Sequence, residues 1–265
     1  MTDERSILLA ADGIGKRFGG VQALSEVSFT IRRGEIYGLI GPNGAGKTTL
    51  FNVLTGIYEP DGGRFTFDGE PLMGLKPNEV AARGIARTFQ NIRLFANLSA
   101  LENVMVGRHV RTKAGVWGAV VRDRRTRDEE AGIERRALEL LDYVGVASRA
   151  NDLAKNLPYG FQRRLEIARA LATEPKLLAL DEPAAGMNAT ETASLESLLH
   201  DIRRDGTTIL LIEHDMKLVM GVCDRVLVLD YGRRIAEGPA AEVQKDPAVI
   251  SAYLGGEVAL NLKGA

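Results

Sequence analysis

Residues 41–48, Gly-Pro-Asn-Gly-Ala-Gly-Lys-Thr, constrain the fold of this chain more than any other segment. They fit the pattern G-x-x-x-x-G-K-S/T, in which a glycine-rich loop surrounds phosphate groups with backbone N–H donors. Glycine allows this tight curl because it has no Cβ to clash. An apolar run at 36–40 precedes the loop and a helical stretch at 49–54 follows it. An ordinary tight turn is the alternative, and the strand–loop–helix context favours phosphate binding.

The residue types in this loop indicate what the phosphate belongs to. Backbone N–H groups and the positive end of the following helix attract a polyphosphate chain. Lys47 can reach the β- and γ-phosphates, and the Thr48 hydroxyl can ligate Mg²⁺. A nucleoside triphosphate with Mg²⁺ is therefore the predicted ligand. The residues predicted to bind it are Gly41, Asn43, Gly44, Gly46, Lys47, Thr48 and Thr49.

The apolar pattern in the rest of the chain predicts an α/β fold. Alternating apolar residues at 27–31 and 64–67 predict half-buried strands of an N-terminal β subdomain. Continuous apolar runs at 177–180, 208–212 and 226–229 predict parallel strands that are covered on both faces. A helix between the first two runs, ended by an Asp-Gly pair, carries one apolar stripe of Leu195, Leu198, Leu199 and Ile202.

A stretch with helical patterning interrupts this α/β core. The 265 residues suffice for a single domain, 1–265, with one inserted lobe. The predicted nucleotide-binding core with its β subdomain covers 1–96 and 161–245, and a tail covers 246–265. The predicted helical subdomain covers 97–160, where an apolar cluster comprises Ala137, Leu138, Leu140, Leu141 and Val144.

Composition narrows the range of partners and compartments. The net charge of −1 argues against a nucleic-acid partner, and the single cysteine, Cys223, rules out an intrachain disulfide and suits a reducing cytoplasm. The N-terminus lacks the apolar region of a signal peptide. No apolar run approaches the ~18 residues that a membrane-spanning helix needs. We therefore expect the chain to act at a membrane only by docking onto an embedded protein.

An acidic pair follows the apolar run at 177–180. Asp181 and Glu182 stand at the carboxyl end of a predicted buried strand, where ligands of open α/β sheets gather. Asp181 is suited to hold Mg²⁺ through a water, and Glu182 to polarise the attacking water. Helix capping by aspartate is the alternative for the pair alone. Together with the phosphate loop, the pair indicates a nucleotide site.

Taken in order, the motifs resemble those of the ABC ATPases over nearly the whole chain. This resemblance implies a P-loop NTPase core with an antiparallel β subdomain and an inserted helical subdomain, and an enzyme that hydrolyses ATP. The matching segments are the P-loop 41–48, a glutamine loop at Gln90, a signature loop at 157–162, a Walker B strand at 177–182 and a switch histidine at His214.

The resemblance implies roles for residues whose own pattern is weak. Phe18 stands where an aromatic residue commonly stacks on adenine. Gln90 would ligate Mg²⁺ or the attacking water and link the site to the helical lobe. His214 would contact the γ-phosphate and, with Gln90 and Glu182, form the catalytic group. Taken alone, Gln90 reads as a surface polar residue and His214 as a structural histidine. The loop 184–188 would pass between two subunits of an ATP-bound dimer.

The signature loop departs from the general family pattern Leu-Ser-Gly-Gly-Gln. Pro158 replaces the serine and offers neither a hydroxyl nor an N–H. Tyr159 replaces the first glycine, and Phe161 replaces the glutamine. The resemblance implies that Tyr159 and Gly160 meet the nucleotide of a partner subunit, where the helix N-terminus still offers backbone donors. An ATP-binding regulatory subunit with poor hydrolysis is an alternative that these departures suggest.

Strings outside the catalytic loops resemble the larger ATPase subunit of branched-chain amino acid importers. This implies permease subunits and a second ATPase subunit, identical or paralogous, as partners, and a periplasmic binding protein indirectly. It also implies a peripheral location on the cytoplasmic face of the inner membrane. The alternatives are an ATPase that drives lipid or lipopolysaccharide export and a soluble ABC ATPase that acts on ribosomes or DNA. The strings lie at 86–95, 181–188, 211–220 and 252–255.

The insert 108–130 carries seven basic residues around an apolar stretch at 115–121. One interpretation is a basic surface near anionic lipid or the permease. The other is a helical hairpin with a solvated face, which we favour because acidic residues are interleaved. The basic residues are Arg108, Arg111, Lys113, Arg122, Arg124, Arg125 and Arg127.

Overall fold

The computed structural model describes residues 6–108 and 124–253, with the side chains of 124–128 left out. Its N-terminal part is an antiparallel sheet of four strands in the order β2-β1-β4-β5. Val27, Phe29 and Ile31 are buried and alternate with less buried neighbours, as the period-two pattern predicted. The strands are β1 (Ile7–Phe18), β2 (Val21–Arg32), β4 (Gly62–Phe67) and β5 (Glu70–Pro71).

A second sheet contains the strands that were predicted to be parallel. Its order is β10-β9-β3-β8-β7-β6, and the strands from β9 to β6 run parallel while β10 pairs antiparallel with β9. Every residue of β3, β7 and β8 is buried, which explains their continuous apolar runs. The strands are β3 (Ile36–Ile40), β6 (Ile85–Arg87), β7 (Leu177–Asp181), β8 (Thr208–Ile212), β9 (Arg225–Asp230) and β10 (Arg233–Pro239).

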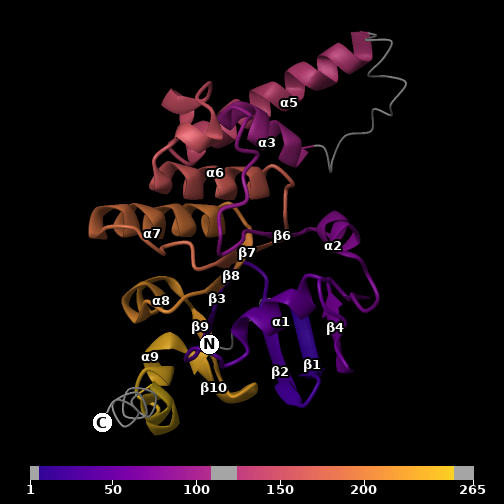
Figure 1. Ribbon diagram of the computed structural model, residues 1–265, viewed down its shortest axis with the longest axis vertical. Helices are drawn as coiled ribbons and strands as arrows, with labels where there is room; N and C mark the ends of the chain where they lie inside the picture. The colour runs from indigo at the N-terminus through magenta and orange to yellow at the C-terminus, as the bar shows by residue number, and fades with distance from the viewer. Residues whose placement is uncertain (1–5, 109–123, 254–265) are drawn as a thin grey trace.

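Helices cover both faces of this second sheet (Figure 1). Helix α1 begins at Lys47, two residues before the predicted stretch, and lies between the two sheets with the β1–β2 sheet beyond it. Helix α7 begins at the side-chain cap of Asn188 and ends before Gly206 (φ 96°). The remaining helices of the core are α2 (Pro77–Arg83), α8 (Met216–Val222) and α9 (Ala240–Val243), while α1 spans Lys47–Leu54 and α7 spans Ala189–Arg204.

Three helices form a lobe at one end of the molecule (Figure 1). They are α3 (Ala100–Arg108), α5 (Arg124–Tyr143) and α6 (Tyr159–Leu171), and they pack against one another. The boundary that we predicted at 160/161 falls inside α6, which is one continuous helix. The domain limits stay a prediction. The insert prediction rests mainly on residues 109–123, which lie outside the described residues.

One member of the apolar cluster predicted for this lobe points outward. Ala137, Leu140, Leu141 and Val144 are buried, but Leu138 is 42% exposed. Successive helical residues are separated by about 100°, so Leu138 turns away from the face that its neighbours bury. The helical pattern predicted for this stretch is confirmed by α5, in which Leu138 lies outside the buried face.

The six-stranded sheet separates two hydrophobic cores. Alternate side chains of β3 enter opposite sides: Ile36 and Ile40 join the helical lobe, α7 and α8, while Tyr37 and Leu39 join α1 and the antiparallel sheet. The loops at the carboxyl ends of β3 and β7 are therefore held between two packed layers. None of the helices within 6–108 and 124–253 is both long and apolar enough to span a bilayer.

Candidate nucleotide-binding site

The predicted phosphate loop connects β3 to α1 as expected. Three of its glycines have positive φ angles: 149° at Gly41, 81° at Gly44 and 101° at Gly46. Lys47 is only 8% exposed, and its Nζ donates hydrogen bonds to the carbonyl oxygens of Gly41 (2.6 Å) and Pro42 (3.0 Å). Burial lowers the pKa of Lys47, although the carboxylates of two nearby acidic residues raise it in part. The ammonium group is thus held against the first two residues of the loop.

Close neighbours explain why glycine is required in this loop. A Cβ on Gly41 would lie 2.1 Å from the carbonyl oxygen of Leu229, and one on Gly46 would lie 2.7 Å from that of Ala23. These neighbours are backbone atoms of β9 and β2, so the loop is held between the two sheets. Gly232 in the turn after β9 adds a hydrogen bond from its N–H to the Ala45 carbonyl (2.9 Å).

Changing Gly41 to alanine is expected to lower the free energy of unfolding by about 1–3 kcal/mol from backbone strain alone. The overlap with the Leu229 carbonyl adds to this loss. Urea unfolding of the variant measures it. Gly20→Ala is the matched control, since nothing lies within 4 Å of a Cβ at Gly20. Equal stability of the two variants would contradict the proposed packing of the loop.

The loop forms one wall of a cleft of about 360 Å³. Gln90, Glu182 and the turn between β9 and β10 also line it. The cleft therefore brings together the P-loop, the glutamine loop and the acidic pair, which are far apart in the sequence. The lining residues are Val21, Gln22, Ala23, Asn43, Gly44, Ala45, Gly46, Lys47, Thr48, Thr49, Gln90, Glu182, Tyr231 and Gly232.

The acidic pair lies where β7 ends, beside the P-loop. Asp181 is 4% exposed, and burial raises its pKa to about 6, while the nearby Arg87 opposes the rise and Glu182 adds to it. Glu182 has a φ of 48°, a left-handed conformation that is uncommon outside glycine. Its N–H donates to the carbonyl of Ile212 (2.9 Å), so β8 holds the strained residue in place.

Gln90 and His214 both approach Glu182. The Gln90 side-chain Nε2 donates to Glu182 Oε2 at 3.1 Å. The Nδ1 of His214 lies 3.9 Å from the same oxygen, and the histidine side chain is 63% exposed. The structure thus places the three predicted catalytic residues within one cluster at the edge of the cleft.

Sequence reasoning missed a buried acid next to this cluster. Glu213 is 1% exposed and accepts hydrogen bonds from the N–H of Ala184 (2.9 Å) and of His214 (3.2 Å). Burial raises its pKa, and these hydrogen bonds oppose the rise. It holds the loop after β7 beside the loop after β8. Its position directly after an apolar strand, like that of Asp181, was the available signal.

Two exposed residues of the cleft were also missed. Val21 and Tyr231 are 68% and 85% exposed and line the rim of the cleft. The expected adenine contact, Phe18, is the β-ladder partner of Val21 and packs edge-on against Tyr58 at 5.2 Å. Phe18 itself does not line the cleft, so its contact with adenine stays a proposal.

Tyr159 and Gly160 of the signature loop do not line this cleft either. They begin α6, and Tyr159 is 45% exposed beside Gly186 in the loop after β7. The predicted site residues therefore fall into two groups. One group lies around the P-loop. The other group is at the start of α6, on the exposed surface outside the cleft.

The oxygen atoms near the P-loop that could ligate a metal suit Mg²⁺ bound together with phosphate. Thr48 and Gln90 line the cleft, and Asp181 lies buried behind it, so the available ligands are hydroxyl, amide and carboxylate oxygens. Within the described ranges, no cluster of three or more acidic, histidine or cysteine side chains could hold a metal alone.

A glycine-rich loop between a buried parallel strand and a helix, with an acidic pair on a nearby strand, defines a P-loop nucleoside triphosphatase. The family described as ABC transporter matches residues 24–185. The chain belongs to the ABC transporter family, in which it is an ATP-binding and ATP-hydrolysing domain. A second family, described as branched-chain amino acid ATP-binding cassette transporter, matches residues 233–259.

Individual relatives agree with this assignment. The chain is 47% identical over 249 residues to the high-affinity branched-chain amino acid transport ATP-binding protein LivG of Salmonella typhimurium, covering 94% of this chain and 98% of LivG. It is 43% identical to BraF of Pseudomonas aeruginosa, which has the same description. This match covers 94% of this chain and 98% of BraF.

Solved structures of ATP-binding cassettes share the fold. The ADP conformation of an ATP-binding cassette of an ABC transporter superposes with a TM-score of 0.82 at 31% identity, covering 94% of this chain and 99% of that one. A dimeric cassette bound to ADP and phosphate gives a TM-score of 0.75 at 26% identity over 88% and 99%. These relationships confirm the predicted fold class.

Proposed function

We propose that this protein is the ATP-hydrolysing subunit of an importer of branched-chain amino acids. The observation that carries the proposal is the similarity to LivG and BraF across 94% of this chain. The separate match of 233–259 to the family described as branched-chain amino acid ATP-binding cassette transporter supports it. The same relatives disfavour lipid export and action on ribosomes or DNA.

The P-loop provides the binding energy for the triphosphate. Its backbone N–H groups and the N-terminus of α1 favour negative charge at the β- and γ-phosphates. Lys47 leaves its hydrogen bonds to the loop carbonyls and contacts the phosphate oxygens instead. Thr49, on the first turn of α1, and Asn43 complete the wall beside the phosphates.

Mg²⁺ neutralises the charge on the phosphate oxygens when it is bound. In this chain Thr48, Gln90 and Asp181 would hold it, the last through a water. Burial raises the pKa of the Asp181 carboxyl, and a cation bound beside it would lower that pKa. We keep these three residues as the proposed magnesium ligands.

Glu182 positions the attacking water. Its carboxylate accepts a hydrogen bond from the water and draws its proton as the oxygen attacks the γ-phosphorus in line. The bond to the β,γ-bridging oxygen breaks, and ADP and phosphate leave. Gln90 holds the carboxylate at 3.1 Å, and His214, whose Nδ1 lies 3.9 Å from the same oxygen, would contact the γ-phosphate.

A second ATPase subunit completes the site. Tyr159 and Gly160 lie away from the cleft of their own subunit, which supports their service to the nucleotide of a partner. The loop 184–188 lies beside Tyr159 and would pass between the subunits. Phe18, at the end of β1, would stack on the adenine. The second subunit is either a copy of this chain or a paralogue.

A largely apolar groove of about 410 Å³ lies between the core and the helical lobe and would receive a cytoplasmic segment of the permease. Arg87 and Phe89, just before Gln90, line it on one side, while Phe95 (49% exposed) and Arg169 lie toward the lobe. Movement of a segment in this groove would reach the glutamine loop directly. The similarity to LivG and BraF supports peripheral attachment at the cytoplasmic face of the inner membrane, with a periplasmic binding protein as an indirect partner.

Loss of this protein is expected to abolish high-affinity uptake of leucine, isoleucine and valine. Radiolabelled uptake is measured in cells that lack the gene, with an unrelated sugar as the control solute. The wild-type gene restores uptake, and the Glu182→Gln variant does not. Normal branched-chain amino acid uptake by the deletion strain, with loss of another solute's uptake, would assign the transporter a different substrate.

A further inference from the structure

The guanidinium group of Arg163 connects α6 to the glutamine loop. Arg163 is 3% exposed, and its Nη1 donates to the carbonyl oxygen of Phe89 at 2.8 Å, while Nη2 donates to that of Gln90. Nη1 also contacts Glu166 Oε2 at 3.2 Å, an ion pair between two buried side chains. The planar fork of an arginine fixes several acceptors at once, which a flexible ammonium cannot do.

A second set of bonds fastens the same loop to α6. Glu166 Oε1 accepts from the N–H of Arg93 at 2.9 Å, and Arg169 Nη1 donates to the Arg93 carbonyl at 2.6 Å. The segment 89–93 is thus attached by its backbone at both ends. The side chain of Gln90 remains directed to Glu182. The backbone that carries that side chain is therefore fastened to α6.

Tyr159 extends this connection to the loop after β7. Its hydroxyl accepts from Arg163 Nε at 3.1 Å, and the guanidinium carbon lies 5.4 Å from the centre of its ring. The ring packs on Gly186, where a Cβ would lie 3.3 Å from its Cε1 atom. Gly186 has a φ of 77°, so glycine suits both the backbone and the close approach of the ring.

We propose that Arg163 and Tyr159 are positioning residues that align Gln90 with Glu182 and tie this alignment to the start of α6 and to the loop at Gly186. The proposal rests on the proposed ATPase function. Tyrosine stands where the general signature pattern has glycine, so this chain has a hydroxyl anchor that the general pattern lacks. The anchor makes the geometry of the catalytic carboxylate depend on the signature loop of the same subunit.

The test is a double-mutant cycle on the full-length protein. Tyr159→Phe keeps the ring on Gly186 and removes only the acceptor for Arg163. We expect kcat for ATP hydrolysis to fall about 3–10-fold, the value of one hydrogen bond, with the Kd for ATP unchanged. In a Gln90→Ala background the same change is expected to alter kcat less than about 2-fold, because the group it positions is gone.

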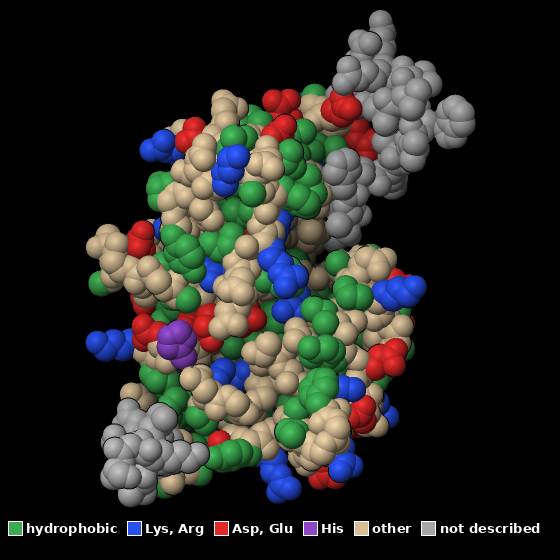
Figure 2. Space-filling model, viewed as in Figure 1, with side chains coloured by type: hydrophobic (Ala, Val, Ile, Leu, Met, Phe, Trp, Pro, Cys, Tyr) green, Lys and Arg blue, Asp and Glu red, His purple; other side chains and the backbone are tan. Residues whose placement is uncertain are grey.

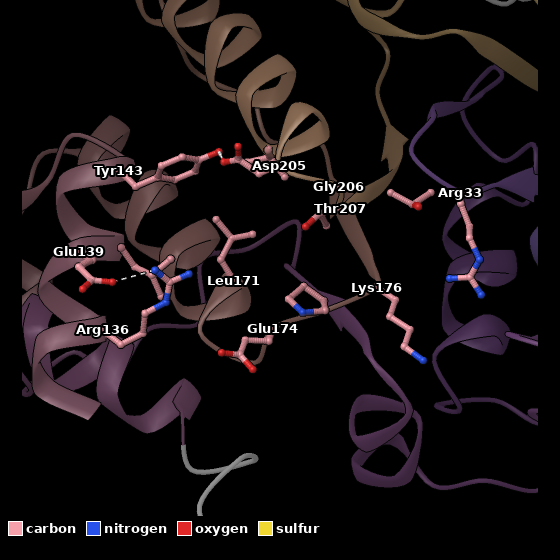
Figure 3. A pocket seen from close by; sticks show the side chains of 14 residues that line it. Arg33, Arg136, Glu139, Tyr143, Leu171, Glu174, Lys176, Asp205, Gly206 and Thr207 are labelled. Atoms are coloured by element: carbon pink, nitrogen blue, oxygen red, sulfur yellow. Dashed lines mark hydrogen bonds and ion pairs between the residues drawn. The ribbon is translucent and has the colours of Figure 1, made fainter. Parts of the chain in front are cut away.

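Tyr143→Phe is the matched control. The Tyr143 hydroxyl also links the lobe to the core, donating to Asp205 Oδ2 at 2.7 Å, but it borders a different hollow of about 570 Å³ (Figure 3). That hollow lies where β7 and β8 begin, whereas the P-loop lies at the carboxyl ends of the parallel strands. We expect the kcat of Tyr143→Phe to equal that of the wild type.

A second variant addresses the guanidinium itself. Arg163→Lys keeps the charge beside Glu166 but cannot bridge both carbonyls and the hydroxyl, so kcat is expected to fall about 10-fold or more. Thermal melting confirms that this variant is folded at the assay temperature.

The outcomes separate the two proposals. A wild-type kcat in Tyr159→Phe, an equal loss in both backgrounds, or a loss of ATP affinity in place of kcat would each overturn the positioning role. Absence of hydrolysis by the wild-type protein would overturn that role and the proposed function together. Hydrolysis with the expected coupling supports the positioning role whatever solute is transported.

Discussion

Glu182→Gln is expected to lower steady-state ATP hydrolysis by about 10²–10⁴-fold while ATP binding is retained. The amide keeps the size of the side chain and its position beside Gln90, but it cannot accept a proton from the attacking water. Phosphate release measures turnover, and calorimetry with Mg²⁺ measures the Kd for ATP. The effect is large because one carboxylate is the base for the chemical step.

The control for this variant is Glu196→Gln, in α7 away from the cleft. It is expected to hydrolyse ATP at the wild-type rate. If Glu182→Gln also did so, the role of general base would belong to another residue, and His214 would be the next to test because its Nδ1 lies 3.9 Å from Glu182.

Lys47→Ala is expected to raise the Kd for ATP about 10–100-fold, with hydrolysis lost in parallel at low ATP concentration. The ammonium is the single basic side chain among the residues that line the described cleft, and a charged hydrogen bond to phosphate is stronger than a neutral one. Isothermal calorimetry of ATP with Mg²⁺ measures the change directly.

Lys245→Ala serves as the comparison, because Lys245 is exposed and follows α9 outside the cleft. The Kd of Lys245→Ala for ATP is expected to equal that of the wild type. Equal affinity of Lys47→Ala and the wild type would remove the P-loop as the phosphate-binding element. Since the nucleotide-binding proposal starts from that loop, such a result would require another site for ATP.

Sequence patterns predicted the buried elements better than the exposed ones. On the face in Figure 2 basic and acidic side chains are interspersed, and hydrophobic side chains appear among them. Periodicity predicts burial only where one face is consistently apolar. It identified β2, β3, β4, β7, β8 and β9, but not β6, which has only three residues, or β10, whose residues are only partly buried or exposed.

In the candidate site, too, residues that follow buried strands were predicted and exposed residues were missed. Gly41, Lys47, Asp181 and Glu182 were predicted because each follows a buried strand and has a chemically distinctive type. Val21 and Tyr231 were not, since an exposed valine or tyrosine is uninformative in a sequence. They join the cleft only because β2 and the turn after β9 meet the P-loop in space.

The sequence by itself determined the phosphate loop, the acidic strand and the parallel sheet, because backbone conformation and strand burial depend on local residue types. The resemblance grouped Gln90 with Glu182, but only the tertiary structure decided how Gln90 contacts that carboxylate, 92 positions away, and that Arg163 holds the Gln90 carbonyl, 73 positions away. Such contacts depend on the order of strands in the sheet and on the packing of α6 against it. No local pattern encodes either.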